Sequence, residues 1–174
     1  MRLPNNKIFL ILAILIFAVS NVFADDAHSK SASAPSKARV ITPISLVNTD
    51  GQGLDFGVIA IGTSNSTVVV SATQTVVANV ASGNAAVITS TPQKAAKFTV
   101  SGEAEKTYTI TIPDNMSVLF GANSLTVDNF SCSNGAGGTI GTDDLFYVGA
   151  VLSVPSTATP GPYQGSFSVT VAYN

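Results

Sequence analysis

The chain has 174 residues, of which 45% are hydrophobic and only 10% are charged, with a formal net charge of −2. Eight basic residues against ten acidic ones leave no electrostatic footprint for a nucleic-acid partner. One cysteine excludes an intrachain disulfide, and one cysteine with one histidine nearly excludes a zinc site of the Cys/His type. We therefore expect no cofactor and no metal.

Residues 1–24 have the pattern of a secretory signal peptide. Arg2 and Lys7 give a basic start, and Ile8–Val19 is an apolar run that is too short to span a bilayer, which needs about 20 residues. Val22-Phe23-Ala24 suits cleavage before the next residue. Since no later stretch is long and apolar enough to span a membrane, we expect an exported protein in the periplasm, at the cell surface or outside the cell.

Residues 25–38 are low in complexity and rich in Ser and Ala, so we expect a flexible N-terminal lead-in. The only histidine, His28, falls in this lead-in, where nothing would fix it as a general base. Residues 39–174 contain no linker and are predicted to form a single domain.

Alternation of apolar and polar residues predicts strands throughout this domain. At the C-terminus, period-two alternation over residues 163–173 predicts one long half-buried strand, with Phe167, Val169, Val171 and Tyr173 on its inner face. Leu145–Val154 is apolar on both faces, as in a central strand. Pro43 interrupts residues 39–47 and marks them as an edge or bulged strand. Further strands are expected within 66–72, 74–81, 85–90, 98–100 and 106–112.

About nine or ten short strands, spaced by roughly 8–12 residues, are typical of an all-β antiparallel sandwich. A closed barrel is the lesser alternative. No stretch carries the apolar stripe and end signals of an amphipathic helix.

Candidates for chemistry are few. Cys132 is expected to be a half-buried free thiol or, less often, one half of an intermolecular bridge. An enzyme would have to use loop acids such as Asp143 and Asp144. The Gly-rich stretch 135–141 lacks the Lys-Ser/Thr ending of a phosphate loop and is expected to be a long connection. A binding module, in contrast, would use loops 114–123 and 131–144.

Several motifs resemble those of a bacterial exported family known only as a domain of unknown function, number 4402. They include Leu54-Asp55-Phe56-Gly57, Phe98-Thr99-Val100-Ser101-Gly102, Val148-Gly149-Ala150-Val151-Leu152 and the C-terminal run from Gly161 to Asn174. The likeness covers nearly all of residues 38–174. The layout is more loosely similar to spore-coat-protein-U-like and chaperone–usher pilus subunits, whose last strand also ends near a terminal Tyr.

The looser resemblance implies an immunoglobulin-like, pilin-like sandwich that lacks a strand, which the N-terminal segment of a neighbouring subunit supplies. It implies protein partners: further copies, other envelope subunits, or a periplasmic chaperone. Residues 39–47 could be the donor, with Val40, Ile44 and Leu46 pointing into a groove; residues 25–38 look too polar for that role.

If residues 39–47 are instead the domain's own first strand, the protein is self-contained or ends an assembly. The leading hypothesis is an exported, non-enzymatic structural subunit. The alternative is a monomeric binding module that recognises a ligand through its loops.

Overall fold

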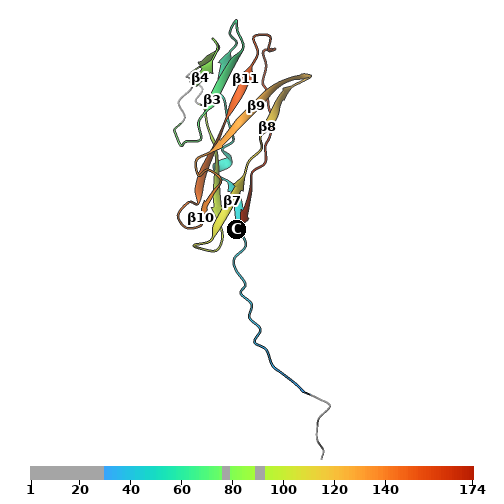
Figure 1. Ribbon diagram of the computed structural model, residues 1–174. Coiled ribbons are helices and arrows are strands. Elements are labelled where there is room, and N and C mark those ends of the chain that lie inside the picture. Colours follow the sequence, from blue (N-terminus) through green and yellow to red (C-terminus); the bar gives the residue numbers. More distant parts are fainter. Residues whose placement is uncertain (1–29, 76–78, 89–92) are drawn as a thin grey trace, which may run out of the picture. The chain divides into compact units, whose positions relative to one another are not determined.

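The computed structural model describes residues 30–75, 79–88 and 93–174 (Figure 1). The expected signal peptide and His28 lie outside the described residues. The chain divides into two units, Met1–Arg39 and Val40–Asn174. In the first unit, residues 30–39 are exposed and belong to no strand. The second unit holds all the strands of the described chain.

The described part of this domain contains twelve strands and one short 3-10 turn, η1 (Thr49–Gly51). The strands are β1 (Ser45–Asn48), β2 (Val58–Ala60), β3 (Ser66–Val70), β4 (Asn79–Ser82), β5 (Ala86–Ile88), β6 (Ala96–Ser101), β7 (Thr107–Thr111), β8 (Asn115–Phe120), β9 (Asn123–Cys132), β10 (Gly137–Thr139), β11 (Leu145–Val154) and β12 (Thr170–Tyr173).

Strand β11 organises the largest sheet, which has seven strands in the order β1-β6-β11-β3-β4, with β9 and β8 attached through β11. The first half of β11 pairs with β6, its second half pairs with β3, and its middle pairs with β9 across a register shift near Gly149. This position explains why β11 is apolar on both faces, as the sequence predicted.

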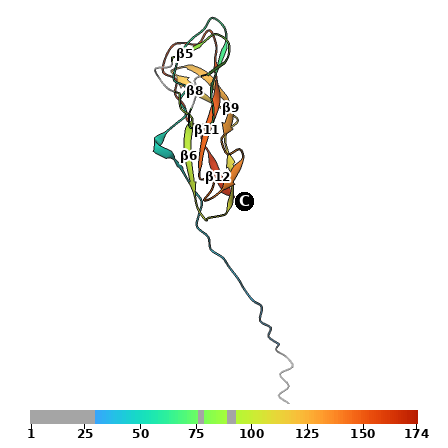
Figure 2. The ribbon, with the colours of Figure 1, turned by 90° about the vertical axis from the view of Figure 1, so that its left-hand side faces the viewer.

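Two smaller sheets complete the domain: β10-β7-β12 and the pair β2-β5. Every strand pair is antiparallel, so the prediction of an all-β antiparallel sandwich is confirmed. β1 and β12 are the edge strands of two different sheets, and they contact each other. In the view of Figure 2, β5 and β8 lie toward the upper end of the domain and β12 toward the lower end.

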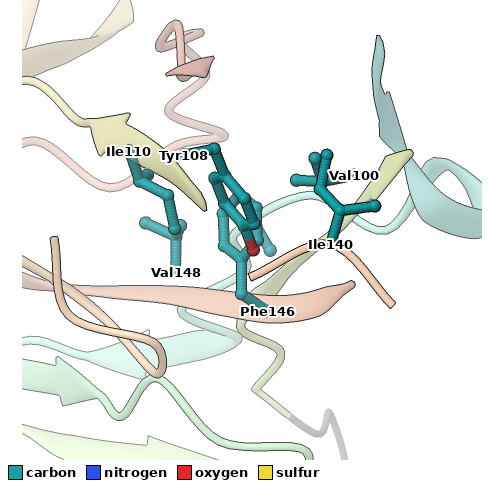
Figure 3. Close-up of a cluster of buried hydrophobic side chains, with 7 residues drawn as sticks. Val100, Tyr108, Ile110, Ile140, Phe146 and Val148 are labelled. Atoms are coloured by element: carbon teal, nitrogen blue, oxygen red, sulfur yellow. The ribbon is translucent and has the colours of Figure 1, made fainter. Parts of the chain in front are cut away.

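The core has two parts. The first is a cluster in which Tyr108 and Ile110 of β7 face Phe146 and Val148 of β11, beside Val100 and Ile140 (Figure 3). The second is centred on the buried side chains of Val68, Leu125, Val127, Ala150, Leu152 and Val154. The half-buried side chains of Leu54 and Phe130 pack against both clusters and join them.

Three sequence predictions need correction. The C-terminal strand spans only Thr170–Tyr173, with one isolated bridge at Gln164, although Phe167 and Val169 do turn inward as expected. The expected loop 114–123 is mostly strand β8 and its tight turn into β9, and residues 137–139 of the Gly-rich connection form β10. These additions raise the strand count from the predicted nine or ten to twelve in the described chain.

Candidate functional site: an apolar groove between two strand edges

A groove of about 1060 Å³ is lined by two stretches that are far apart in sequence, residues 53–61 and 158–167, and by strands of the largest sheet. Residues 53–61 form one wall, and residues 158–167 form the other. Between them, apolar side chains of β6, β8, β9 and β11 form the floor: Ala96, Phe98, Met116, Val118, Leu125, Val127, Leu152 and Val154. The groove therefore lies directly over the second core cluster.

The wall at residues 53–61 makes backbone pairs with two other stretches of the chain. The backbone of Asp55 pairs in both directions with Lys94, at 2.8 and 2.9 Å, and β2 pairs with β5. In the described chain β2 has no second strand partner. Four apolar side chains of this wall are half-buried and pack on the floor: Leu54, Phe56, Ile59 and Ile61. Within the described residues, β2 is thus an edge strand of a two-stranded sheet.

The opposite wall is also extended and paired on one side. Gln164 exchanges backbone hydrogen bonds of 2.8 and 3.0 Å with Leu119 of β8. A Cβ at position 165 would meet the side chain of Met116 and the carbonyl of Ser117, so glycine lets this wall lie close to β8. Beyond it, β12 pairs with β7 and is the outer strand of its sheet. The second wall thus continues into a strand whose outer edge is unpaired in the described chain.

Aromatic rings line the groove where the two core clusters meet. Phe167 contacts Phe98 and Phe130, with ring centroids at 6.3 and 5.2 Å, and Tyr163 contacts Phe120 at 5.8 Å. Phe167 and Tyr163 are only half-buried. Covering half-exposed apolar side chains along an elongated groove with a further chain is favourable, because it removes apolar surface from water.

The structure divides the seven residues predicted for assembly. Ile44, Leu46, Phe167, Val169, Val171 and Tyr173 all pack against the first core cluster of their own domain. Val40 does not, because its side chain is 94% exposed. β1 begins after Pro43 and pairs with β6, placing Leu46 opposite Val100. Ser45–Asn48 is thus an edge strand of its own domain, and the groove lies beyond its far end, beside Asn48.

Cys132 is a half-buried free thiol at the end of β9, opposite Val148. Burial raises the pKa of this thiol, opposed by a smaller effect of a hydrogen bond with the backbone of Asn134. A thiol with a raised pKa is mostly protonated at neutral pH and is a weak nucleophile.

The loop acids serve the local fold. The carboxylate of Asp143 accepts a 3.0 Å hydrogen bond from the backbone N–H of Thr139, and that of Asp144 accepts one of 2.7 Å from Gly141. Tyr108 donates its hydroxyl to the carbonyl of Asp143. Within the described residues, no three His, Cys, Asp or Glu side chains lie close enough together to hold a metal ion.

Sequence reasoning did not find the groove itself. Its floor depends on the β8–β9 hairpin, where burial alternates along Asn115–Phe120 with Met116, Val118 and Phe120 half-buried. That period-two pattern was the available signal for a strand in place of a loop.

This fold defines an all-β antiparallel sandwich with an apolar groove. The model of the family described as a domain of unknown function, DUF4402, matches residues 46–173, and the chain belongs to this family. No curated protein and no solved structure matches the chain. The described part of the chain contains no helix with the length and apolarity that a bilayer crossing needs.

Proposed function

We propose that the protein is an exported, non-enzymatic structural subunit that joins a surface assembly by accepting a β-strand from a protein partner. The observation that carries the proposal is the groove, whose walls, residues 53–61 and 158–167, each have strand partners on one side alone among the described residues. An extended peptide placed between them would gain backbone hydrogen bonds from the free edges and bury alternate side chains on the floor.

The physics of strand edges supports this reading. A long apolar edge that stays open is an aggregation site, so exported β-proteins keep such an edge only where something covers it. Covering the half-buried Phe56, Ile59, Tyr163 and Phe167 would add to the hydrophobic stabilisation of the domain by about 25 cal/mol for each Å² of apolar surface removed from water.

The remaining parts of the proposal follow from the sequence. The signal pattern of residues 1–24 supports export to the periplasm, the cell surface or the medium. The partners would be further copies or other envelope subunits, with a periplasmic chaperone covering the groove before assembly. The immunoglobulin-like, pilin-like type of the sandwich belongs to this proposal as well.

The test is a gel of surface and periplasmic extracts in SDS, with and without boiling, probed for this protein. Strand-exchanged polymers unfold slowly, so a ladder that collapses to monomer only on boiling is expected. Reductant separates such a ladder from bridging through Cys132. A lysine in place of Phe167, which lines the groove, should abolish the ladder, whereas Ser168→Lys, on the exposed face, should not. Circular dichroism of both variants reports whether they fold.

The second candidate is a self-contained binding module. The apolar floor of the groove suits an elongated apolar ligand. The sequence placed the binding site in loops 114–123 and 131–144, but most of residues 114–123 is strand. A single monomer band in every lane, together with saturable uptake of a fluorescent fatty acid that Phe167→Lys removes, would favour the module over the subunit.

A further inference from the structure

We infer that residues 31–36 of the lead-in are a site of O-linked glycosylation, at which an envelope glycosyltransferase attaches a sugar to one or more of the three serines. The inference goes beyond the proposed strand-acceptor function and shares with it only the proposed export of the chain. Three features of the described residues carry it: exposed hydroxyl groups on an unpaired backbone, a proline among small residues, and basic residues on both sides.

The segment offers hydroxyl groups that make no contact of their own. Ser31, Ser33 and Ser36 are exposed and belong to no strand. Within the described part of the chain, neither their hydroxyls nor the backbone groups of residues 31–37 make a hydrogen bond. A modifying enzyme has to draw its acceptor peptide into its own active site. A segment without hydrogen bonds can enter such a site with no prior local unfolding of the protein.

The residues between the serines suit the same role. Ala32 and Ala34 place only methyl groups beside the hydroxyls, so no bulky side chain hinders access to them. Pro35 fixes its own φ and disfavours the helical conformation at the residue before it, which keeps the peptide extended. Because proline has no N–H group, it also keeps the segment out of the interior of a sheet. Tracts rich in Ser or Thr together with Pro are typical carriers of O-linked sugars.

The charges around the serines are complementary to a sugar donor. Lys30 and Lys37 enclose the three serines, Arg39 follows, and residues 30–41 contain no acidic residue. Residues 42–174, in contrast, carry three lysines and eight acidic residues, a net side-chain charge of −5. A glycosyl diphosphate is an anion, so its attraction to the basic segment exceeds its attraction to the acidic domain.

A second Ser/Thr/Pro-rich stretch of the chain, residues 155–162, lacks this accessibility. The backbone N–H of Ser156 donates a 3.0 Å hydrogen bond to the side-chain oxygen of Asn65. The hydroxyl of Thr159 donates one of 3.2 Å to the side-chain oxygen of Asn123. An enzyme would have to break these bonds to reach the hydroxyls of this loop, so we expect the loop to stay unmodified. It provides a control of similar composition within the same protein.

The transfer is a substitution at the anomeric carbon of the sugar. The serine Oγ attacks this carbon in a glycosyl diphosphate donor, and the new carbon–Oγ bond replaces the bond from the sugar to the diphosphate. The diphosphate leaves with the electron pair of the broken bond. The hydroxyl proton passes to a base of the transferase, and no group is oxidised or reduced.

The experiment measures the mass of the chain exported by its own host. Intact-mass spectrometry should give the chain that begins at Asp25 plus the mass of one or more sugar residues. Electron-transfer dissociation of peptides that contain residues 31–36 should place this added mass on their serines. Chemical deglycosylation with trifluoromethanesulfonic acid should remove it, which identifies the added group as sugar.

Two variants show which hydroxyl groups carry the sugar. The test variant replaces the three serines of the segment: Ser31→Ala, Ser33→Ala and Ser36→Ala. It should lose all of the added mass. The control variant combines Ser156→Ala with Thr157→Ala in the ordered loop and should keep the added mass of the wild type. Both variants should fold, because the substituted positions lie outside the strands.

The contrary outcomes are distinct. Residues 31–36 without added mass, in a chain that begins at Asp25, would refute the glycan and leave export and the strand acceptor standing. Added mass that the control variant loses and the test variant keeps would place the sugar on the folded domain and overturn the assigned site. Added mass that resists deglycosylation would overturn sugar as the attached group. A chain that keeps residues 1–24 would refute export, and with it both proposals.

Discussion

The hydroxyl of Tyr173 in β12 donates a 2.8 Å hydrogen bond to the carbonyl oxygen of Thr42 and accepts a 2.6 Å bond from the backbone N–H of Glu103. One side chain thus ties the last strand to the entry of the domain and to the turn between β6 and β7. The three residues are far apart in sequence, so this contact closes the domain at the end opposite the β8–β9 turn (Figure 1).

Removing this hydroxyl should loosen the closure. Tyr173→Phe removes the hydrogen bonds to the Glu103 N–H and the Thr42 carbonyl, and we expect a loss of about 1–2 kcal/mol in the free energy of unfolding. Denaturant unfolding of the purified mature chain measures it. Tyr147→Phe is the matched control, because the hydroxyl of Tyr147 makes no hydrogen bond within the described residues. Equal losses in both variants would show that the Tyr173 bonds contribute nothing.

Close packing against the same hydroxyl predicts a glycine effect. A Cβ at position 102 would lie 2.2 Å from the Tyr173 hydroxyl oxygen and 2.9 Å from a methyl group of Ile140. Gly102→Ala should therefore destabilise the domain by about 1–3 kcal/mol through overpacking. Gly53→Ala has open space around the new methyl group and should be neutral or slightly stabilising. Thermal unfolding of the two variants compares them, and a neutral Gly102→Ala would contradict this packing.

Much of the fold could be predicted from the alternation of apolar and polar residues along the sequence. The full extent of β11 and the inward face of Phe167 and Val171 were predictable, because burial on a strand follows period two. The strand expected over residues 39–47 is an edge strand as predicted, but it begins only at Ser45, after Pro43, which cannot donate to a ladder. The pairing of the strands, in contrast, could not be predicted from the sequence. The break between Gln164 and Thr170 and the open edges beside the groove depend on partners far away in sequence, which no local pattern encodes.

The alternation in β11 predicts a sharp contrast between neighbours. Phe146 is fully buried and stacks on Phe98 at 5.4 Å, whereas Leu145 is 43% exposed. Phe146→Ala should cost about 3–5 kcal/mol, because it removes a large core side chain and leaves a cavity. Leu145→Ala should cost well under half of that. Comparable losses in denaturant unfolding would mean that the register between β11 and β6 is wrong.

Charge on the inner face of the last strand should be more damaging than charge on its outer face. The side chain of Val171 packs against the first core cluster, and that of Thr170 is exposed. We expect Val171→Lys, like Val169→Lys, to prevent folding or assembly, because an ammonium cannot be buried there without a partner. Thr170→Lys should be exported and folded. Protease resistance in periplasmic extracts reports folding, and wild-type behaviour of Val171→Lys would reverse the assigned face.

The half-buried thiol of Cys132 predicts how stability depends on pH. Burial raises the pKa of this thiol above its ordinary value of 9.0, so the native state keeps the proton to a higher pH than the unfolded chain does. The protonated thiol then makes its full contribution to the free energy of unfolding below the pKa of the thiol in the unfolded chain. This contribution is lost as the pH rises through the pKa of the thiol in the native state. Relative to Cys132→Ala, the wild-type free energy of unfolding should fall between pH 8 and pH 10.5, a window set by the pKa of a cysteine thiol near 8.5 to 9.

The difference between the two proteins isolates this effect. Burial also raises the pKa of Tyr108, but that tyrosine is present in both proteins and its contribution to the difference cancels. Alkylation of native Cys132 at pH 7.5 should be slower than that of a free thiol, for the same reason. A difference in stability that stays constant from pH 7 to pH 10.5 would show that the thiol is hydrated in the native domain and that the end of β9 does not pack against β11 as described.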